Sequence, residues 1–464
     1  MNPTLKRAVV IVALGLLLSG CKPRTEAQKV EATPSPSLPV AAETAVPITL
    51  PILDALLADE AFRAELRSKL QLTDDQIAAL RRISSEAVTK LHTSNAEIQS
   101  GSVEAARQDA IKAIREVTGP DKSEQLMALA RNRWNKGGEE FAADVARQAE
   151  PTMLPGPNAV PADTRIVVNI PAFRMDVFAG GSLIKSYKIG IGYPQFPLPQ
   201  GLRKAQQIIF NPTWTPPNSP WVDAMNVTPG EVIGAGSKHN PLGPIKIPIG
   251  SPSLIHGGKP LAKIGAFASH GCVGMTNAQV KDFARVLAQA ARTELTEETM
   301  SAYLKKRTKT QTVKLDQLVP VELRYETIVF EDGKLHIYRD VYDQNTNTEE
   351  NLRAVFAANG ASLDNLGEDE RAQVLEALNA LGRHPKKLPK PVPAATPANV
   401  SVNNALNESE RKAEAERQKK LRTQREIVIE IVTLAGKGYP APMNLDSGAG
   451  TAVSAVPTPS PNTP

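Results

Sequence analysis

The sequence predicts a multidomain α+β protein, in which a mainly-β central domain is flanked by an N-terminal helical bundle and C-terminal helices. Three observations support this prediction. The 464 residues exceed what one compact core holds, so at least two folded parts are expected. Apolar residues recur every three or four positions before residue 149 and alternate in short runs after residue 164. Segments rich in proline at 22–50, 150–163 and 383–406 separate the parts.

The first 21 residues have the pattern of a signal peptide. Lys6 and Arg7 precede an apolar run from Ala8 to Leu18, which is shorter than the roughly 20 residues that span a bilayer. Leu18-Ser19-Gly20-Cys21 resembles the bacterial lipobox, whose cysteine is lipidated, and a plain cleaved signal is the alternative. Because no Asp follows Cys21, we expect a lipid anchor in the outer membrane, facing the periplasm.

Residues 22–50 are expected to form an extended tether, because their composition buries little apolar surface. Residues 51–149 follow the helical period and are expected to form a separate helical domain. Within them, Thr73 and Gln76 have the spacing of a capping box, and Gly119-Pro120 interrupts the pattern. These helices are candidates for binding other envelope proteins.

Residues 164–345 follow the linker 150–163 and are expected to form the β-domain. Gly180-Gly181 and Asp332-Gly333 are typical of hairpin turns between alternating segments, and a helix is expected from about residue 278 to 291. The rest of the chain is expected to contain a helical segment at 346–382, the linker 383–406, a charged helix at 407–437 and a disordered tail at 438–464.

The chain contains only two cysteines, Cys21 and Cys272, so lipidation of the first leaves Cys272 as a lone thiol. A free thiol in an oxidising compartment is prone to oxidation, which favours a chemical role, although a buried inert cysteine is the alternative. Two of the six histidines, His256 and His270, precede it closely. A neighbouring imidazole that accepts the thiol proton is what a nucleophilic cysteine requires.

The segment around these residues resembles the L,D-transpeptidase (YkuD-type) catalytic domain. Its signature is HG, a spacer and SHGC, which here are His256-Gly257 and Ser269-His270-Gly271-Cys272. Accompanying segments occur in the same order: residues 197–201, 212–217 and 240–243, and a closing hairpin similar to 319–342. The resemblance covers roughly residues 164 to 342. It implies a barrel-like or sandwich-like β-domain with one or two helices.

The resemblance also implies roles for individual residues. Cys272 would be the nucleophile, His256 the base, and His270 a supporting residue. The carbonyl of Gly257 would orient the imidazole, and backbone amides near Gly271 and Cys272 would form the oxyanion hole. The implied substrate is a tetrapeptide stem of peptidoglycan, from which D-Ala leaves before an amine takes up the acyl group. No metal or organic cofactor is implied.

Two positions depart from the family pattern. Gly274 stands where the family usually has Arg, and Gly258 where it often has Thr. A guanidinium at 274 would position active-site groups or an anionic substrate, so Lys259 and Arg285 are candidates to replace it. The candidate substrate-binding residues are Trp214, Ser269, Gly274 and Lys259, although core packing explains Trp214 and Trp221 equally well.

Other function classes remain open or are disfavoured. Without the Arg, the chain could be a catalytically impaired peptidoglycan-binding lipoprotein, and with water as acceptor it would be an L,D-carboxypeptidase or endopeptidase. A zinc hydrolase is disfavoured because HExxH is absent. A papain-like protease is disfavoured because its cysteine precedes its histidine. The net charge of +5 is mild, and we expect no nucleic-acid partner.

Overall fold

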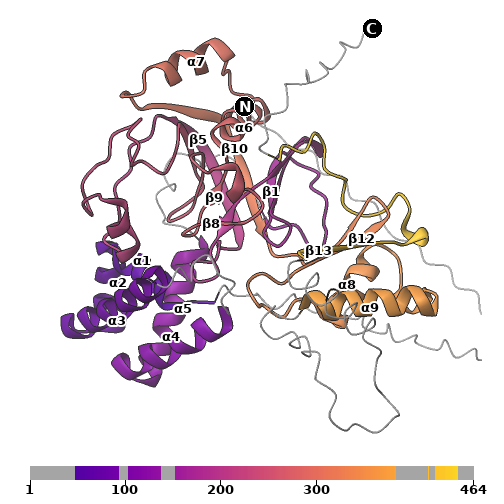
Figure 1. Ribbon diagram of the computed structural model, residues 1–464, viewed down its shortest axis with the longest axis horizontal. Coiled ribbons are helices and arrows are strands. Elements are labelled where there is room, and N and C mark those ends of the chain that lie inside the picture. The colour runs from indigo at the N-terminus through magenta and orange to yellow at the C-terminus, as the bar shows by residue number, and fades with distance from the viewer. Residues whose placement is uncertain (1–46, 94–102, 137–151, 383–415, 417–423, 448–464) are drawn as a thin grey trace, which may run out of the picture. The chain divides into compact units, whose positions relative to one another are not determined.

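The computed structural model describes residues 47–93, 103–136, 152–382, 416 and 424–447. They lie in one compact unit with a mixed α+β architecture, which confirms the predicted fold class (Figure 1). The signal segment with Cys21, most of the tether, and the linker 383–406 lie outside the described residues. No helix within the described ranges is long and apolar enough to cross a membrane.

The N-terminal region is helical, as predicted, and forms the helices α1 (Leu50–Leu57), α2 (Glu60–Leu70), α3 (Asp74–Thr93), α4 (Val103–Thr118) and α5 (Pro120–Lys136). Thr73 and Gln76 form the expected capping box at the start of α3, with backbone-to-side-chain distances of 3.1 and 3.2 Å. Gly119 has a φ of +80°, which ends α4 before Pro120 begins α5. The helices share a core that includes Phe62 and Trp134, neither of which is exposed.

The central domain is built on an eight-stranded mixed sheet, whose strand order is β3-β2-β1-β10-β5-β6-β7-β9. Its strands are β1 (Arg165–Asn169), β2 (Arg174–Ala179), β3 (Ser182–Lys188), β5 (Gly201–Phe210), β6 (Ile245–Pro248), β7 (Leu254–His256), β9 (Val273–Gly274) and β10 (Gln311–Arg324). The pairs β1–β10 and β7–β9 are parallel, and the others are antiparallel. A second, two-stranded sheet pairs β4 (Ile191–Gly192) with β8 (Phe267–Ser269).

Helix α6 (Asn277–Ala290) begins shortly after β9 and packs on the sheet. A capping box of Thr276 and Gln279 fixes its first turn. Its buried face, which includes Val280 and Phe283, joins the sheet's own core. Helix α7 (Glu297–Lys305) was not predicted, because its nine residues are mostly polar and bury only one apolar side chain, Met300.

The C-terminal region corrects two predictions. Residues 426–430 form a strand, β13 (Glu426–Glu430), where a charged helix was expected across 407–437. The hairpin of β11 (Ile328–Glu331) and β12 (Lys334–Tyr338) does not join the central sheet, because the free edge of β12 pairs with β13. The β-branched residues in Glu-Ile-Val-Ile-Glu suit an edge strand, and Ile429 is buried there. Figure 1 shows α8 (Glu349–Ala358) and α9 (Glu368–Gly382) against this sheet, with which they share a core.

After β13 the chain returns to the central sheet. The backbone N–H groups of Ser186 and Lys188 on β3 donate hydrogen bonds of 2.9 Å to the carbonyls of Met443 and Asp446. Asp446 in turn donates one of 2.9 Å to Ser186. Strand β3 is the outer strand of the sheet, so the tail covers one of its two edges.

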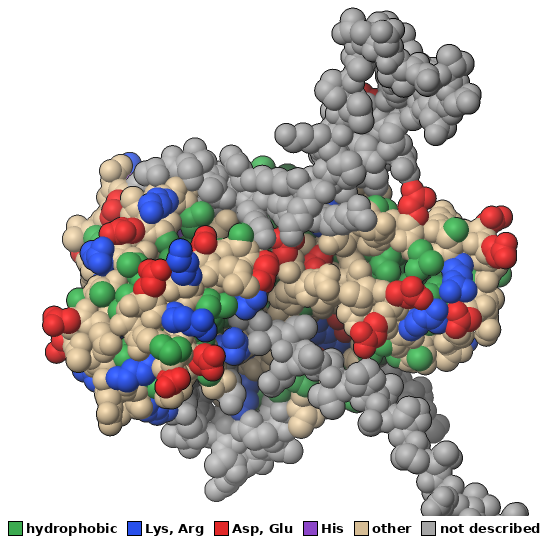
Figure 2. Space-filling view, turned by 90° about the horizontal axis from the view of Figure 1, so that it is seen from below, with side chains coloured by type: hydrophobic (Ala, Val, Ile, Leu, Met, Phe, Trp, Pro, Cys, Tyr) green, Lys and Arg blue, Asp and Glu red, His purple; other side chains and the backbone are tan. Residues whose placement is uncertain are grey.

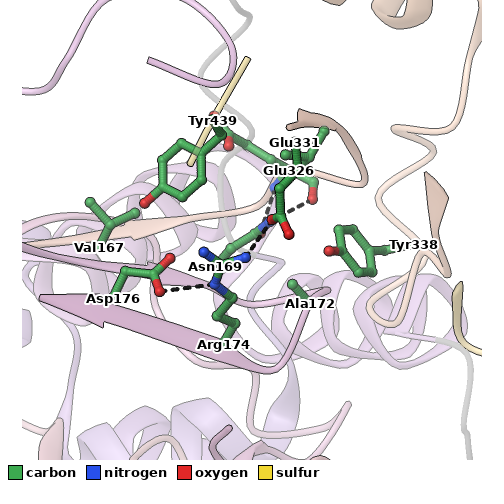
Figure 3. A pocket seen from close by; sticks show the side chains of 10 residues that line it. Val167, Asn169, Ala172, Arg174, Asp176, Glu326, Glu331, Tyr338 and Tyr439 are labelled. Carbon is green, nitrogen blue, oxygen red and sulfur yellow. Dashed lines mark hydrogen bonds and ion pairs between the residues drawn. The ribbon is translucent and has the colours of Figure 1, made fainter. Parts of the chain in front are cut away.

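A buried cluster of charges lies where β2 meets the C-terminal region (Figure 3). Arg174 donates to Asp176 at 2.9 Å, to the Glu331 carboxylate, and to the Pro440 carbonyl at 3.1 Å. Burial lowers the pKa of Arg174, but the two carboxylates outweigh burial and raise it. The small cavity beside Arg174 holds about 10 Å³, room for one water molecule, and none of the predicted site residues lines it. The cluster is structural.

Charge on the outer surface is mixed. Figure 2 shows Lys and Arg side chains interspersed with Asp and Glu side chains over the described part of one face. That face carries no large area of a single sign among the residues described, so the mild excess of +5 is not concentrated there.

Candidate active site

The residues that the sequence predicts as catalytic lie where β7 and β9 run side by side at the second edge of the sheet. In this parallel pair, Ile255 lies opposite Val273 and His256 opposite Gly274. Ile255 and Val273 point into the sheet's core and are not exposed. Because side chains alternate along a strand, His256 and the residue before Val273, Cys272, point to the opposite face together. Strand pairing thus brings the predicted base and nucleophile to one face.

His256 is held as a neutral imidazole. Its Nδ1 lies 2.7 Å from the carbonyl oxygen of Gly257. A carbonyl can only accept, so the contact with Gly257 favours the neutral form that carries its proton on Nδ1, and a second hydrogen bond joins the ring to the backbone of Leu242. Burial and the nearby Lys259 lower the pKa of His256 to about 3. The ring therefore stands as a proton acceptor at neutral pH, and Gly257 lies in the orienting position that the resemblance implied.

Cys272 keeps part of its surface exposed. Burial of the thiol raises its pKa above the ordinary value. A hydrogen bond from the backbone of Leu254 and the positive charges of Lys259 and Arg203 act in the opposite direction, since each favours the thiolate. The surroundings of the sulfur are therefore basic and include an amide donor.

Ser269 organises the loop that carries the nucleophile. Its hydroxyl accepts a hydrogen bond of 2.9 Å from the Cys272 N–H and donates one of 2.5 Å to the Cys272 carbonyl. The amide of Cys272 is thus already engaged within the loop. The Gly271 N–H donates no hydrogen bond to any described residue. Of the two amides expected to bind an oxyanion, only that of Gly271 therefore remains available.

Gly271 is required by its surroundings. Its φ of +97° is a conformation that favours glycine. A Cβ added there would lie 2.9 Å from the ring of Trp134 on α5. Trp134 is held by its own Nε1–H, which donates to the Pro197 carbonyl at 3.1 Å. This contact could not be inferred from the sequence, because Trp134 lies more than 130 positions before Gly271.

His270 lies among aromatic rings. Trp221 stacks on it, with centroids 4.2 Å apart, and Phe196 and Tyr193 meet it edge-on at 4.6 and 5.3 Å. Trp214, a candidate for substrate binding, lies one ring further out, 6.1 Å from Trp221. The two tryptophans therefore belong to the aromatic wall that supports His270.

The two departures from the family pattern have local causes. Gly258 has a φ of +79°, and a Cβ there would lie 2.4 Å from the Pro241 carbonyl, so threonine does not fit. At Gly274, the three atoms nearest to an added Cβ all belong to Lys259: Cγ at 2.8 Å, Cε at 3.1 Å and Cδ at 3.4 Å. Arg285, the other candidate, is instead paired with Asp282 on its own helix, at 2.7 Å.

Arg203 on β5 is a site residue that sequence reasoning missed. It is 3% exposed, and its guanidinium donates to the carbonyls of Gly250, at 2.7 Å, and Trp134. Its charge also acts on Cys272. No local signal in the sequence could have found it, because pairing within the sheet brings it near. Among the described residues, no group of three or more His, Cys, Asp and Glu could hold a metal ion.

Comparisons with known proteins find a match to one family and similarity to several solved structures. No curated protein sequence matches the chain. Among solved structures, the chain is similar to the Enterococcus faecium L,D-transpeptidase in a cysteine-to-serine variant (17% identity, TM-score 0.21, covering 35% of this chain and 50% of that one) and to that organism's catalytic domain (16%, 0.23, 36% and 100%). A Mycobacterium tuberculosis L,D-transpeptidase is similar at 14% identity (TM-score 0.20, 35% and 57%).

The chain spans only about half the length of two of these solved structures, 50% of the Enterococcus faecium variant and 57% of the Mycobacterium tuberculosis enzyme. The family match covers fewer residues than the resemblance noted in the sequence, because it ends at residue 309, before β10 and the hairpin that follows it. Strand β10 nevertheless pairs with β1 and β5 inside the same sheet. Residues 163–309, which contain the whole catalytic loop, match the L,D-transpeptidase catalytic domain family (YkuD).

Proposed function

We propose that the protein is a peptidoglycan L,D-transpeptidase that works through a cysteine acyl-enzyme. The observation that carries this is the register of β7 and β9, which puts Cys272 and a neutral, oriented His256 on the same face of the sheet. The family match over residues 163–309 supports a transpeptidase-type activity on stem peptides.

The reaction proceeds in two transfers. His256 Nε2 takes the Cys272 proton, and the sulfur attacks the carbonyl carbon that precedes D-Ala in a tetrapeptide stem. The Gly271 amide faces the developing oxyanion. The amide bond breaks, D-Ala leaves with the proton from His256, and a thioester remains. An amine then attacks the thioester, and the sulfur leaves and is reprotonated; the amine belongs to a second stem peptide or to an anchored protein.

The purified protein incubated with tetrapeptide muropeptides tests this. We expect 3-3 cross-links by mass spectrometry from the wild type, none from Cys272→Ala, and at least about a hundredfold fewer from His256→Ala, in line with loss of a general base. Lys281→Met is the control, because Lys281 is exposed on α6. Cross-links that persist in Cys272→Ala would remove the mechanism.

Two alternatives would give different results in the same assay. Release of D-Ala without cross-links would identify a carboxypeptidase, in which water replaces the amine. An impaired binding lipoprotein would form no products and would also leave Cys272 unmodified by a carbapenem, which acylates an active nucleophile. The partial exposure of Cys272 and the basic groups around it favour the enzyme.

We also propose that the enzyme is anchored by a lipid on Cys21 in the outer membrane and faces the periplasm, where stem peptides are accessible. The support is the lipobox-like sequence. Fractionation of cells should find the wild type in the outer membrane and Cys21→Ser in the soluble periplasmic fraction. A Cys21→Ser variant that remained with the membrane would contradict the lipid anchor. The helical regions are candidates for binding other envelope proteins there.

A further inference from the structure

Two cations at the catalytic edge have no carboxylate partner. Neither Lys259 nor Arg203 forms an ion pair with any described acidic residue, although Arg203 is almost fully buried. Burial of an unpaired charge is unfavourable by several kcal/mol, so buried cations are normally paired. The Arg203 Nε, moreover, lacks any hydrogen-bond partner among the described residues. An anion that the folded protein itself supplies is therefore expected beside them.

Lys259 is positioned by the backbone of the site. Its N–H donates to the Met275 carbonyl at 3.1 Å, which ties the residue to the segment just after β9. Its aliphatic chain then runs across Gly274, with Cγ 2.8 Å and Cε 3.1 Å from where a Cβ would be. Gly274 lies opposite His256, on the face of the sheet to which Cys272 also points. The absence of a side chain at 274 is what gives the lysine its path.

We propose that Lys259 and Arg203 are positioning residues that hold the Cys272 thiolate, with Lys259 in the space that a basic side chain at 274 would occupy. This inference rests on the proposed function, since it concerns the activation of the same nucleophile. The positive charge that an arginine at position 274 would provide is thus assigned to two residues, Lys259 in the loop after β7 and Arg203 on strand β5.

The other groups around the sulfur leave these two cations as its counter-charges. His256, on β7, has a pKa lowered to about 3, so it is neutral at pH 7 and carries no positive charge beside the sulfur before the reaction. His270 lies in the aromatic wall. Lys246, on β6, and Lys263, beyond β7, add positive charge near His256 and Lys259, and no described acidic residue is among the groups that act on Cys272.

The charges act on one another as the proposal requires. Burial lowers the pKa of both cations, whereas the charge of Cys272 raises both. Conversely, Lys259 and Arg203 each lower the pKa of the thiol, against the effect of its burial. In a site of low dielectric such interactions are screened little by salt, so they persist at physiological ionic strength.

Alkylation of Cys272 by iodoacetamide, followed from pH 5 to 10 with peptide-resolved mass spectrometry, measures the thiol pKa without any substrate. Lys259→Met removes the charge and keeps most of the side chain. We expect a rise of about one pKa unit, and hence roughly tenfold slower alkylation at pH 7. Arg203→Gln should give a comparable rise, while Lys259→Arg, Arg203→Lys and the exposed control Lys281→Met should stay near the wild type.

A double variant sharpens the test. Since the atoms nearest to a Cβ at 274 belong to Lys259, shortening the lysine makes room for the start of a side chain there. Lys259→Ala with Gly274→Arg should therefore recover most of the alkylation that Lys259→Ala alone loses. The midpoint of thermal unfolding should stay near that of the wild type in the Lys259 variants, because the residue is partly exposed.

An unchanged thiol pKa in Lys259→Met and Arg203→Gln, in folded protein, would overturn the proposal. So would an equal rise in Lys259→Arg, because a merely structural role does not depend on charge. The result is separable from the proposed function. If the wild type formed no cross-links but the thiol pKa still rose in Lys259→Met and Arg203→Gln, the transpeptidase activity would be contradicted. The role of the two cations would still stand.

Discussion

The central domain contains two groups of cations in opposite surroundings. At β2, Arg174 is surrounded by Asp176 and Glu331, and on β1 and β10 Arg165 and Arg324 share Glu322. At the β7–β9 edge, Lys259 and Arg203 have carbonyls, a thiol and other basic groups around them. The first arrangement fixes the fold by pairing every charge. The second group has no carboxylate partner, and its positive charges act on Cys272, the proposed nucleophile, which becomes negative when it loses its proton.

The largest expected effect tests the paired group. Arg174→Met leaves Asp176 and Glu331 buried without their cation, so we expect a loss of about 3–5 kcal/mol in the free energy of unfolding. Denaturant titration measures it. The triple variant in which Asp176→Asn and Glu331→Gln accompany Arg174→Met should recover much of the loss, because no buried charge is then left alone. If Arg174→Met lowered the free energy of unfolding by less than about 1 kcal/mol, the paired group would not stabilise the fold as proposed.

An effect that is smaller within any one pH unit, but grows as the pH falls, tests the second group. His256 has a folded pKa of about 3, below the ordinary 6.5, so its neutral form contributes stability above pH 6.5 that is lost as the pH falls toward 3. Its protonation would add a third positive charge to the edge. We expect the wild type to lose about 1.4 kcal/mol per pH unit in this window relative to His256→Gln.

The difference between the two proteins is the quantity to measure, by urea titration at each pH. Glu326 and Glu331 have pKa values raised chiefly by burial, and they contribute in the opposite direction in acid, but equally in both proteins. Parallel pH profiles for the wild type and His256→Gln would show that His256 is not held neutral by the fold.

Much of the site was predictable because its information is local. The motif at His256-Gly257 and Ser269-His270-Gly271-Cys272 carries the proposed nucleophile and base, and the Gly257 carbonyl contacts the His256 ring as expected. The capping box at Thr73 and the two glycine turns were likewise read from adjacent residues. The helical and β regions followed from the spacing of apolar residues.

What was not predictable depends on pairing between distant segments. Arg203 lies on β5, more than 60 positions from Cys272, and only the order of strands in the sheet brings it close. Sequence reasoning named both Lys259 and Arg285 as replacements for the missing arginine. It could not choose between them, because the choice depends on the path of one side chain across Gly274. Strand β13 was taken for a helix since its partner, β12, lies about 90 residues away.

The return of the tail to β3 bears on how the protein can be shortened. The backbone groups of Ser186 and Lys188 are satisfied by residues near 443 and 446, and β12 is covered by β13. A chain cut before residue 424 would keep Cys272 and His256, yet it would leave the backbone groups along β3 and β12 unpaired and accessible to other molecules. Self-association of such a fragment would therefore report on the lost tail and say nothing about the chemistry at Cys272.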